Sequence, residues 1–186
     1  SPTQLPGTQW TQIMTCRQQS YAIKTDGTFW VWGANPSGAL GLNNEVARSS
    51  PTQVPGNWSE VFPGGGNSRH IIAKKSDNTI WSWGYNALGG LGINDNKTRS
   101  SPIQLPGTQW NKITTYTYGS MGTKTDGSLW TWGYESYGTL GHNQASYRTS
   151  SPQQIPGTWT SITNNQTGNA AAIKDDGTLW TWGQNS

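Results

Sequence analysis

One eleven-residue stretch occurs four times along the chain and constrains the fold more than any other feature. Its first copy, residues 23–33, runs Ile-Lys-Thr-Asp-Gly-Thr-Phe-Trp-Val-Trp-Gly. The first Trp of each copy stands at position 30, 81, 130 or 180, which gives spacings of 51, 49 and 50 residues. A fixed period of this length is typical of proteins built from stacked copies of one unit. We therefore predict a single repeat array with units at about 1–48, 49–99, 100–149 and 150–186.

The residues around this stretch predict short antiparallel strands joined by a tight turn. Residues 10–15 and 20–24 alternate apolar with polar side chains, as half-buried strands do. The Asp-Gly pair at 26–27 is a hairpin signal, because Gly accepts a positive φ without a Cβ clash. Asn78 takes the place of this Gly in the second unit, and Asn tolerates positive φ better than most other residues. The proline-flanked segment 1–7 suits an edge strand.

The strand after the turn carries apolar side chains on both faces. Alternation places Trp30 and Trp32 on one face and Phe29 and Val31 on the other. Such strands need cover on both sides, so we expect sheets stacked face to face. All twelve Trp fall at repeated positions, three in each of four units, which leaves none for a separate role.

Four Trp-x-Trp-Gly strands are followed by only three Gly-x-Leu-Gly loops, at 38–41, 89–92 and 138–141. The missing loop would connect the C-terminal unit to the proline segment at 1–7, so we expect an open end with an unpaired blade edge. We expect the repeated side chains to build the scaffold. They are Trp30, Trp32, Trp81, Trp83, Trp130, Trp132, Trp180, Trp182, Gly27, Gly127, Gly177, Leu40, Leu91 and Leu140.

Composition narrows the classes of protein that fit. Charged residues are 11% of the chain, against about 25% in typical domains. Twelve Trp nevertheless indicate a folded core rather than disorder. The net charge is +3 and the basic residues fall singly, so we expect no nucleic-acid partner. No apolar run is long enough to cross a membrane, and the lone Cys16 excludes an internal disulfide or a thiolate zinc site.

The chemistry of catalysis is poorly represented in this sequence. His70 and His142 lie in different units, and the chain has no paired carboxylates, nucleophile elbow or phosphate-binding loop. The triplet at 94–96, Asn-Asp-Asn, lacks the spaced acidic ligands of a calcium loop, so we interpret it as a polar loop. We therefore expect no enzyme activity, no catalytic residues, no cofactor and no metal.

Cations recur at two positions of the repeat. Lysines stand two residues before the turn Asp, and arginines stand before each Ser-Pro segment. A functional interpretation makes them rings of charge for an acidic partner. The structural interpretation, which we favour, has the Lys stems cover apolar surface and the Arg side chains bind connector carbonyls or a neighbouring blade. The residues are Lys24, Lys75, Lys124, Lys174, Arg48, Arg99 and Arg148.

Taken together, the turn and the segment at 32–41, Trp-Gly-Ala-Asn-Pro-Ser-Gly-Ala-Leu-Gly, resemble the regulator of chromosome condensation repeat. The family pattern is a small residue and Asp-Gly, a strand ending in Trp-Gly, then x-Asn-x-x-Gly-Gln-Leu-Gly at a period near 50. Residues 83–92 fit equally well, and 132–141 fit except for Glu135 in the Asn position. The family histidine is kept only at His70, while Gln19, Gly119 and Asn169 take the equivalent places.

This resemblance implies an all-β fold, a β-propeller of about four four-stranded blades. The polar, uncharged composition favours a bacterial or viral member of the family. The family ring usually has seven blades. Four units therefore either close as a small ring, pair with another chain, or form part of a larger ring.

Residues that differ between the units are the better guide to function. They cluster before the predicted inner strands, at 17–21, 67–70, 116–120 and 164–169, near one mouth of the ring. Tyrosines, arginines and a histidine there suit a protein or glycan surface. The candidate partner-binding residues are Arg17, Tyr21, Arg69, His70, Tyr116, Tyr118 and Asn169.

Three functional hypotheses follow. The first is a non-enzymatic structural and protein-interaction propeller that binds copies of itself or a larger particle, such as a virion or cell-surface assembly. The second is a glycan-binding module. The third is the nucleotide-exchange or chromatin role known for part of the family. The polar, uncharged composition resembles surface proteins of microbes or virions, so we expect an extracellular or virion-surface location rather than a cytoplasmic one.

Overall fold

The computed structural model describes the chain except for residues 1–3, 6, 63–67, 145, 166–167 and 185–186. Parts of the predicted variable loops at 67–70 and 164–169 therefore lie outside the described residues. Of residues 135, 136 and 146, only the backbone is described. The described part contains β-strands and one short 3-10 turn, η1 (Pro36–Gly38), so the prediction of an all-β fold is confirmed.

The strands form four antiparallel sheets, which we call blades A to D. Blade A contains β1 (Trp10–Cys16), β2 (Gln19–Lys24), β3 (Phe29–Gly33) and β4 (Arg48–Val54). Blade B contains β5 (Trp58–Phe62), β6 (His70–Lys75), β7 (Ile80–Gly84) and β8 (Arg99–Gln104). Blade C contains β9 (Trp110–Tyr116), β10 (Gly119–Lys124), β11 (Leu129–Ser136) and β12 (Ser146–Ile155). Blade D contains β13 (Trp159–Asn164), β14 (Ala170–Lys174) and β15 (Leu179–Trp182).

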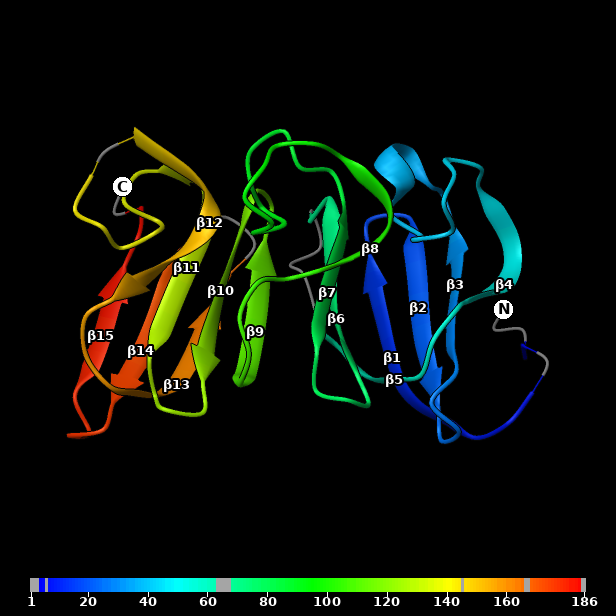
Figure 1. Cartoon of the computed structure of the whole chain (residues 1–186), viewed down its shortest axis with the longest axis horizontal. Coiled ribbons are helices and arrows are strands. Elements are labelled where there is room, and N and C mark those ends of the chain that lie inside the picture. The colour runs from blue at the N-terminus through cyan, green and yellow to red at the C-terminus, as the bar shows by residue number, and fades with distance from the viewer. Residues whose placement is uncertain (1–3, 6, 63–67, 145, 166–167, 185–186) are drawn as a thin grey trace.

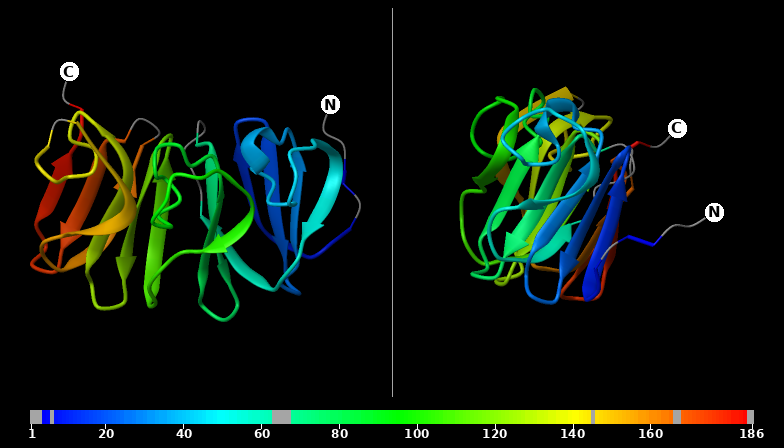
Figure 2. Two further views of the ribbon diagram at one scale, coloured as in Figure 1. Left: turned by 45° about the horizontal axis from the view of Figure 1, so that its top comes forward. Right: turned by 90° about the vertical axis from the view of Figure 1, so that its right-hand side faces the viewer.

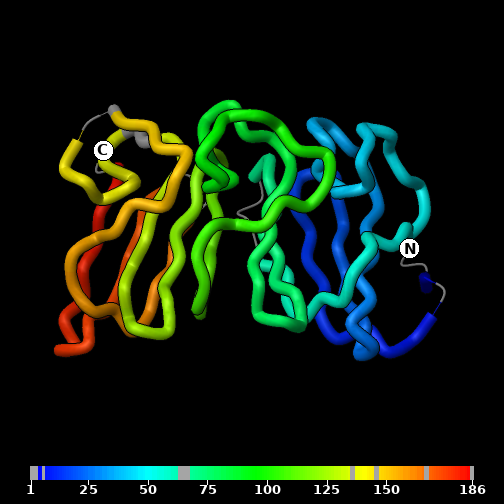
Figure 3. Tube along the Cα trace, viewed as in Figure 1, coloured from blue at the N-terminus to red at the C-terminus, as the bar shows by residue number. Residues whose placement is uncertain are grey.

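The blades stand side by side in chain order, from blade A at one end of the row to blade D at the other (Figure 1). The tube in Figure 3 passes through one blade after another, and the views in Figure 2 show the same order. Blades A and D lie apart, so the row is open. This arrangement confirms the predicted blades and is that of a partial propeller.

Each proline segment is a strand of the preceding blade, whereas the sequence units place it at the start of the following one. Strands β4, β8 and β12 contain Pro51, Pro102 and Pro152 and pair with β3, β7 and β11 as the outermost strands. Proline has no backbone N–H, so it is tolerated at a sheet edge. The blades are therefore offset by one strand from the sequence units. Blade D has three strands within the described residues.

The predicted turn has the expected backbone. Gly27 has φ +79° and Asn78, at the equivalent position, has φ +67°. Asp26 Oδ1 accepts hydrogen bonds from the backbone N–H and the hydroxyl of Thr28, and the Thr28 hydroxyl in turn accepts one from Trp30 Nε1. These bonds lower the pKa of the Asp26 carboxyl from its usual value. The turn therefore orients the first Trp of the strand.

Each repeated lysine lies over two tryptophan rings. Lys75 Nζ, for example, lies 3.7 Å from the ring centroid of Trp81 and 5.3 Å from that of Trp58. Lys24, Lys124 and Lys174 have the same arrangement in their blades. A cation above an aromatic face is attracted by the ring quadrupole. These contacts support the structural interpretation of the lysines.

In blades B, C and D the second Trp of the pair joins its blade to the preceding one. Trp83 is fully buried, and its Nε1 donates to the Ala39 carbonyl in the loop of blade A at 2.9 Å. Trp132 makes the same bond to Gly90 in blade B. The Trp83 ring packs at 6.0 Å from Phe29 across the A–B interface. Apolar side chains of both blades form one core there.

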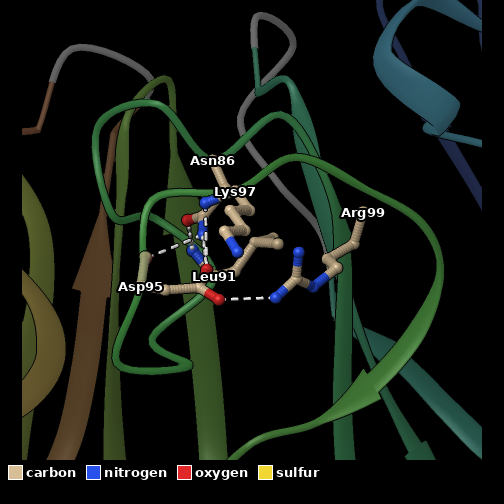
Figure 4. Close-up of polar contacts among 5 residues, drawn as sticks. All are labelled: Asn86, Leu91, Asp95, Lys97 and Arg99. Atoms are coloured by element: carbon tan, nitrogen blue, oxygen red, sulfur yellow. Dashed lines mark hydrogen bonds and ion pairs between the residues drawn. The ribbon is translucent and has the colours of Figure 1, made fainter.

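The Asn-x-x-Gly-x-Leu-Gly loops are held by their Asn side chains, as Figure 4 shows for blade B. Asn86 Oδ1 accepts from the Leu91 backbone N–H, and Asn86 Nδ2 donates to the Asp95 carbonyl. The Asp95 carboxylate accepts from the Lys97 backbone N–H and pairs with Arg99. The clamp buries Leu91 fully. Asp95 is thus a structural residue of a polar loop, as the sequence predicts.

The other two repeated arginines also bind the connectors. Arg48 donates to the carbonyls of Val46 and Ala47, and Arg148 reaches across to the Ala87 carbonyl of blade B. The structural interpretation of the arginines is supported by these bonds.

His70 is a core residue between blades B and C. It is 1% exposed, and its Nε2 lies 2.9 Å from Ser120 Oγ, which donates to the Gly90 carbonyl. Because the Ser120 proton is used in that bond, all three groups are satisfied when His70 Nε2 carries the ring proton. Desolvation lowers the pKa of His70 from 6.5 to about 4.

Replacing Trp83 tests the inter-blade contact. We expect Trp83→Ala to lower the free energy of unfolding by about 3–5 kcal/mol, because it empties a buried site and leaves the Ala39 carbonyl with one donor fewer. Urea unfolding followed by circular dichroism measures this. Trp180→Ala is the matched control, since Trp180 is 49% exposed and its loss should cost clearly less. Equal losses in the two variants would contradict the assignment.

The pKa of His70 predicts a pH-dependent stability. Between pH 6.5 and about 4 the unfolded chain binds a proton at His70 that the folded chain does not, so stability falls as the pH falls. The loss between pH 7 and 4.5 should be on the order of 2–3 kcal/mol. His70→Gln should flatten this slope in chemical unfolding at several pH values.

His142→Gln is the control for that experiment. His142 is only partly buried, and desolvation lowers its pKa as well, so its loss should leave most of the slope. The turn aspartates have lowered pKa values, and their contribution is lost only as the pH falls through about 4 and below. An unchanged slope in His70→Gln would contradict the prediction.

Candidate functional site

The outer face of blade A exposes side chains that are buried in the other blades. Ile13 on β1 is 78% exposed, whereas its counterparts Val61, Ile113 and Ile162 are at most 2% exposed. The equivalence follows from the pairing of these residues with Ala22, Ala73, Gly122 and Ala172. Trp32 is likewise only half-buried, although Trp83 and Trp132 are fully buried.

A hollow of about 430 Å³ lies on the outer side of β1 and β2. It is bordered by Leu5, Trp10, Ile13, Met14 and Trp32. We call the surface formed by Leu5, Trp10, Ile13 and Trp32 the A end face. The A end face has the kind of side chains that pack against the preceding blade in blades B, C and D, but here they are exposed.

The opposite end of the row is uncovered in the same way. Leu179 on β15 is 68% exposed, whereas its counterparts Phe29, Ile80 and Leu129 are at most 1% exposed. Ile173 on β14 is 39% exposed, although Ile23 at the equivalent position of blade A is buried. We call the surface of Ile173 and Leu179 the D end face. In blades A to C this side of the sheet packs against the next blade.

A smaller feature lies at the rim between blades A and B. A cleft of about 170 Å³ is lined by Arg17, Gln19, Ser37, Ser68 and Arg69, with Pro36 and Ala39. We call it the rim cleft. Arg17 is exposed in the turn between β1 and β2, where it has φ +53°, and Arg69 is exposed just before β6. Arg17 and Arg69 are the two charged residues of the described lining, so the charge that they bring to the rim cleft is positive.

Arg69 is oriented by two aromatic rings. Its guanidinium carbon lies 5.5 Å from the ring centroid of Tyr85 and 5.8 Å from that of Tyr118. Stacking on a ring leaves the edge of the planar guanidinium, with its N–H donors, available to a partner. The structure therefore brings three of the predicted partner-binding residues, Arg17, Arg69 and Tyr118, to one short stretch of surface.

Gln19 lines the rim cleft and has a buried side-chain donor without a partner among the described residues. It is 4% exposed, and the unpaired donor is its Nε2. The reason is a substitution in the repeat. In blade B, His70 stands at the position equivalent to Gln19 and bonds to Ser120 of blade C. The residue of blade B that is equivalent to Ser120 is Ile71, which has no hydroxyl group to offer Gln19.

Other residues that the sequence singled out as partner-binding lie inside the protein. Tyr21 is 1% exposed and donates its hydroxyl to the Ala39 carbonyl, and Tyr116 is 5% exposed and donates to the Tyr134 carbonyl. His70 is buried as described above. Burial removes all three from direct contact with a partner. Tyr21 and Tyr116 bond to carbonyls of their own blades, and His70 bonds to Ser120 of the next blade.

Asn169 is partly exposed at the far end of the row, away from the rim cleft. Its Oδ1 accepts from the backbone N–H of Gln184 and it borders a hollow of about 670 Å³ in blade D. The predicted partner-binding residues therefore fall at separate places rather than in one site.

Sequence reasoning misses Ile13, Leu179 and Gln19. The first two follow the pattern of ordinary core positions, and nothing in the sequence distinguishes them from their buried counterparts. The unpaired amide of Gln19 becomes predictable once the strand register is known. The register shows that Ile71 is the counterpart, for Gln19, of the Ser120 that bonds to His70.

The described residues contain no group of three or more His, Cys, Asp or Glu placed to hold a metal ion. Cys16 is buried and donates its Sγ–H to the Ser68 carbonyl, and burial raises the pKa of its thiol. Searched over the same residues, the structure has no helix that is long and apolar enough to span a bilayer.

Similar proteins place this geometry in a known family. The chain is 32% identical over 107 residues to the human "Probable E3 ubiquitin-protein ligase HERC3", a match that covers 55% of the chain and 10% of that protein. It is 32% identical over 93 residues to the "Ultraviolet-B receptor UVR8" of Arabidopsis thaliana, over 49% of the chain and 21% of the receptor. The chain thus spans about a tenth to a fifth of the length of these relatives.

Solved structures show the same fold. Human WBSCR16 superposes with a TM-score of 0.80 at 22% identity, over 100% of this chain and 50% of that one. Prp20p from Saccharomyces cerevisiae has a TM-score of 0.80 at 18% identity, over 98% of this chain and 48% of Prp20p. The regulator of chromosome condensation (RCC1) repeat model matches residues 26–68, 77–123 and 126–164, more than half of the chain. The chain belongs to the RCC1 repeat family.

Proposed function

We propose that this chain is a non-enzymatic protein-interaction module that associates with copies of itself through its two end faces. Its family supports a role in protein binding. The yeast relative Prp20p binds Gsp1p and histones, and yeast RCC1 (Prp20) has been solved bound to Kap60. The self-association is supported by the exposure of Ile13 and Leu179 at positions that are buried elsewhere in the repeat.

The two end faces are complementary halves of one interface. The A end face is the side on which blades B, C and D receive the preceding blade, and the D end face is the side that blades A, B and C present to the next one. A second copy can therefore place its A end face on the D end face of the first. This head-to-tail contact is heterologous, so it leads to a ring or a linear array.

The proline segments support the same contact. The segments 50–56, 101–107 and 151–157 follow the pattern Ser-Pro-x-Gln-apolar-Pro-Gly, and their apolar residues Val54, Leu105 and Ile155 are buried. Residues 1–7 have the same pattern, yet Leu5 is 40% exposed. The outer edge of β15 has no strand beside it among the described residues. Residues 1–7 of a second copy suit that edge.

Attachment to a larger particle, such as a virion or cell-surface assembly, stays a prediction from composition, as does an extracellular location. Glycan binding and a nucleotide-exchange or chromatin role also stay predictions. The exposure of the two end faces is the observation that supports self-association.

Charged substitutions on the end faces test the proposal. We expect the wild-type chain to sediment as a species heavier than the 20.3 kDa monomer, with a mass that rises with concentration. Ile13→Glu and Leu179→Glu should each weaken association at least tenfold. Removing one buried apolar side chain from an interface costs about 1.5–3 kcal/mol, and about 1.4 kcal/mol corresponds to tenfold.

Val46→Glu is the matched control, because Val46 is 61% exposed on the connector before β4 and lies on neither end face. It should associate like the wild type. All three substituted side chains are exposed, so the fold should persist, which circular dichroism checks. A wild-type chain that stays monomeric at high concentration would overturn the proposal, and so would equal weakening by Val46→Glu.

A further inference from the structure

The rim cleft has the size and the lining residues of a site for a single small anion. Its volume of about 170 Å³ lies below the roughly 300–1,000 Å³ of pockets that hold cofactors or drug-sized ligands. It has two arginines, and its described lining contains no carboxylate. An acidic group that enters is therefore attracted without competition from an acid of the protein itself.

The buried amide of Gln19 distinguishes this cleft from a surface that merely carries two arginines. A buried N–H donor without a partner costs about 1–3 kcal/mol, so a ligand oxygen that accepts from it recovers stabilisation. Gln19 is held in place by the pairing of β2 with β1 and β3, opposite Cys16 and Gly33. The backbone that carries the Gln19 amide is therefore fixed before any ligand arrives, which lowers the entropic cost of binding.

We propose that the rim cleft binds the side-chain carboxylate of an acidic segment of a partner protein. In this arrangement the Arg69 guanidinium, held between Tyr85 and Tyr118, donates to the carboxylate, Arg17 supplies the second positive charge, and Gln19 Nε2 donates to an oxygen at the base of the cleft. Planar carboxylates match the planar fork of arginine. The net charge of +3 favours approach of an acidic partner.

This site is separate from the end faces, since the rim cleft lies between blades A and B rather than at the ends of the row. It adds a partner chemistry to the protein-interaction role and does not depend on self-association. The Ile13→Glu variant, in which we expect self-association to be weakened, should bind the same acidic probe as the wild type. Failure of one proposal is thus distinguishable from failure of the other.

Nuclear magnetic resonance of the ¹⁵N-labelled chain tests the site directly. The probe is a blocked peptide, acetyl-Gly-Glu-Glu-Gly-amide, and its control is acetyl-Gly-Gln-Gln-Gly-amide, which lacks the carboxylates. We expect the side-chain amide resonance of Gln19 to shift saturably with the Glu peptide and to stay unchanged with the Gln peptide. The Gln19→Leu variant identifies that resonance by its absence.

Variants separate the site from general electrostatic attraction. Arg17→Gln and Arg69→Gln should each weaken binding of the Glu peptide at least tenfold. Lys97→Gln is the matched control, because it removes one charge from an exposed side chain on the connector of blade B and should change binding less than twofold. Gln19→Leu should lose at least tenfold in binding, while its midpoint of thermal unfolding stays unchanged or rises because an unpaired buried donor is removed.

Three outcomes would overturn the proposal. The first is the absence of a Gln19 shift with the Glu peptide. The second is equal weakening by Lys97→Gln and the two arginine variants, which would indicate unspecific attraction. The third is tighter binding of inorganic phosphate than of the Glu peptide, measured by the same resonance, which would replace the carboxylate by a phosphoryl ligand.

Discussion

The face-to-face contact between blades is the interaction on which the rest of the structure depends. Each interior contact places the second Trp of a Trp-x-Trp-Gly strand against the Leu-bearing loop of the preceding blade, as Trp83 does on Ala39. A buried Trp removes roughly 150–250 Å² of surface from water. A few such rings therefore suffice to form a core in a chain with only 31% hydrophobic residues. The turn, the lysines and the Asn clamps hold these rings in register.

The same contact explains where the chain can bind. A blade has two apolar sides, and a row of blades leaves one side uncovered at each end, which exposes Ile13 and Leu179. The rim cleft arises at an interior contact between two blades. There the contact between blades A and B is imperfect, because Ile71 stands opposite Gln19 where the B–C contact pairs Ser120 with His70. Scaffold and candidate sites are therefore consequences of one repeated interface.

Much of the scaffold was predictable because identical side chains recur at one period. The strands, the turn at Gly27, the buried Leu91 and the structural role of the lysines agree with the pattern. The pattern could not show that a proline segment belongs to the preceding blade, since an edge strand can pair with a neighbour on either side of it in sequence. It also misplaced Tyr21, because variation between the units suggests a binding residue whereas this side chain is buried.

The repeat, its period and the apolar character of both strand faces follow from the order of the amino acids, and these decide that the chain forms stacked blades. They are local properties, carried by each unit alone. The packing of the blades, in contrast, decides which copies of a repeated residue are covered and which donors find partners across a blade boundary. Those outcomes depend on the neighbour, and the neighbours of Ile13, Leu179 and Gln19 differ from those of their counterparts.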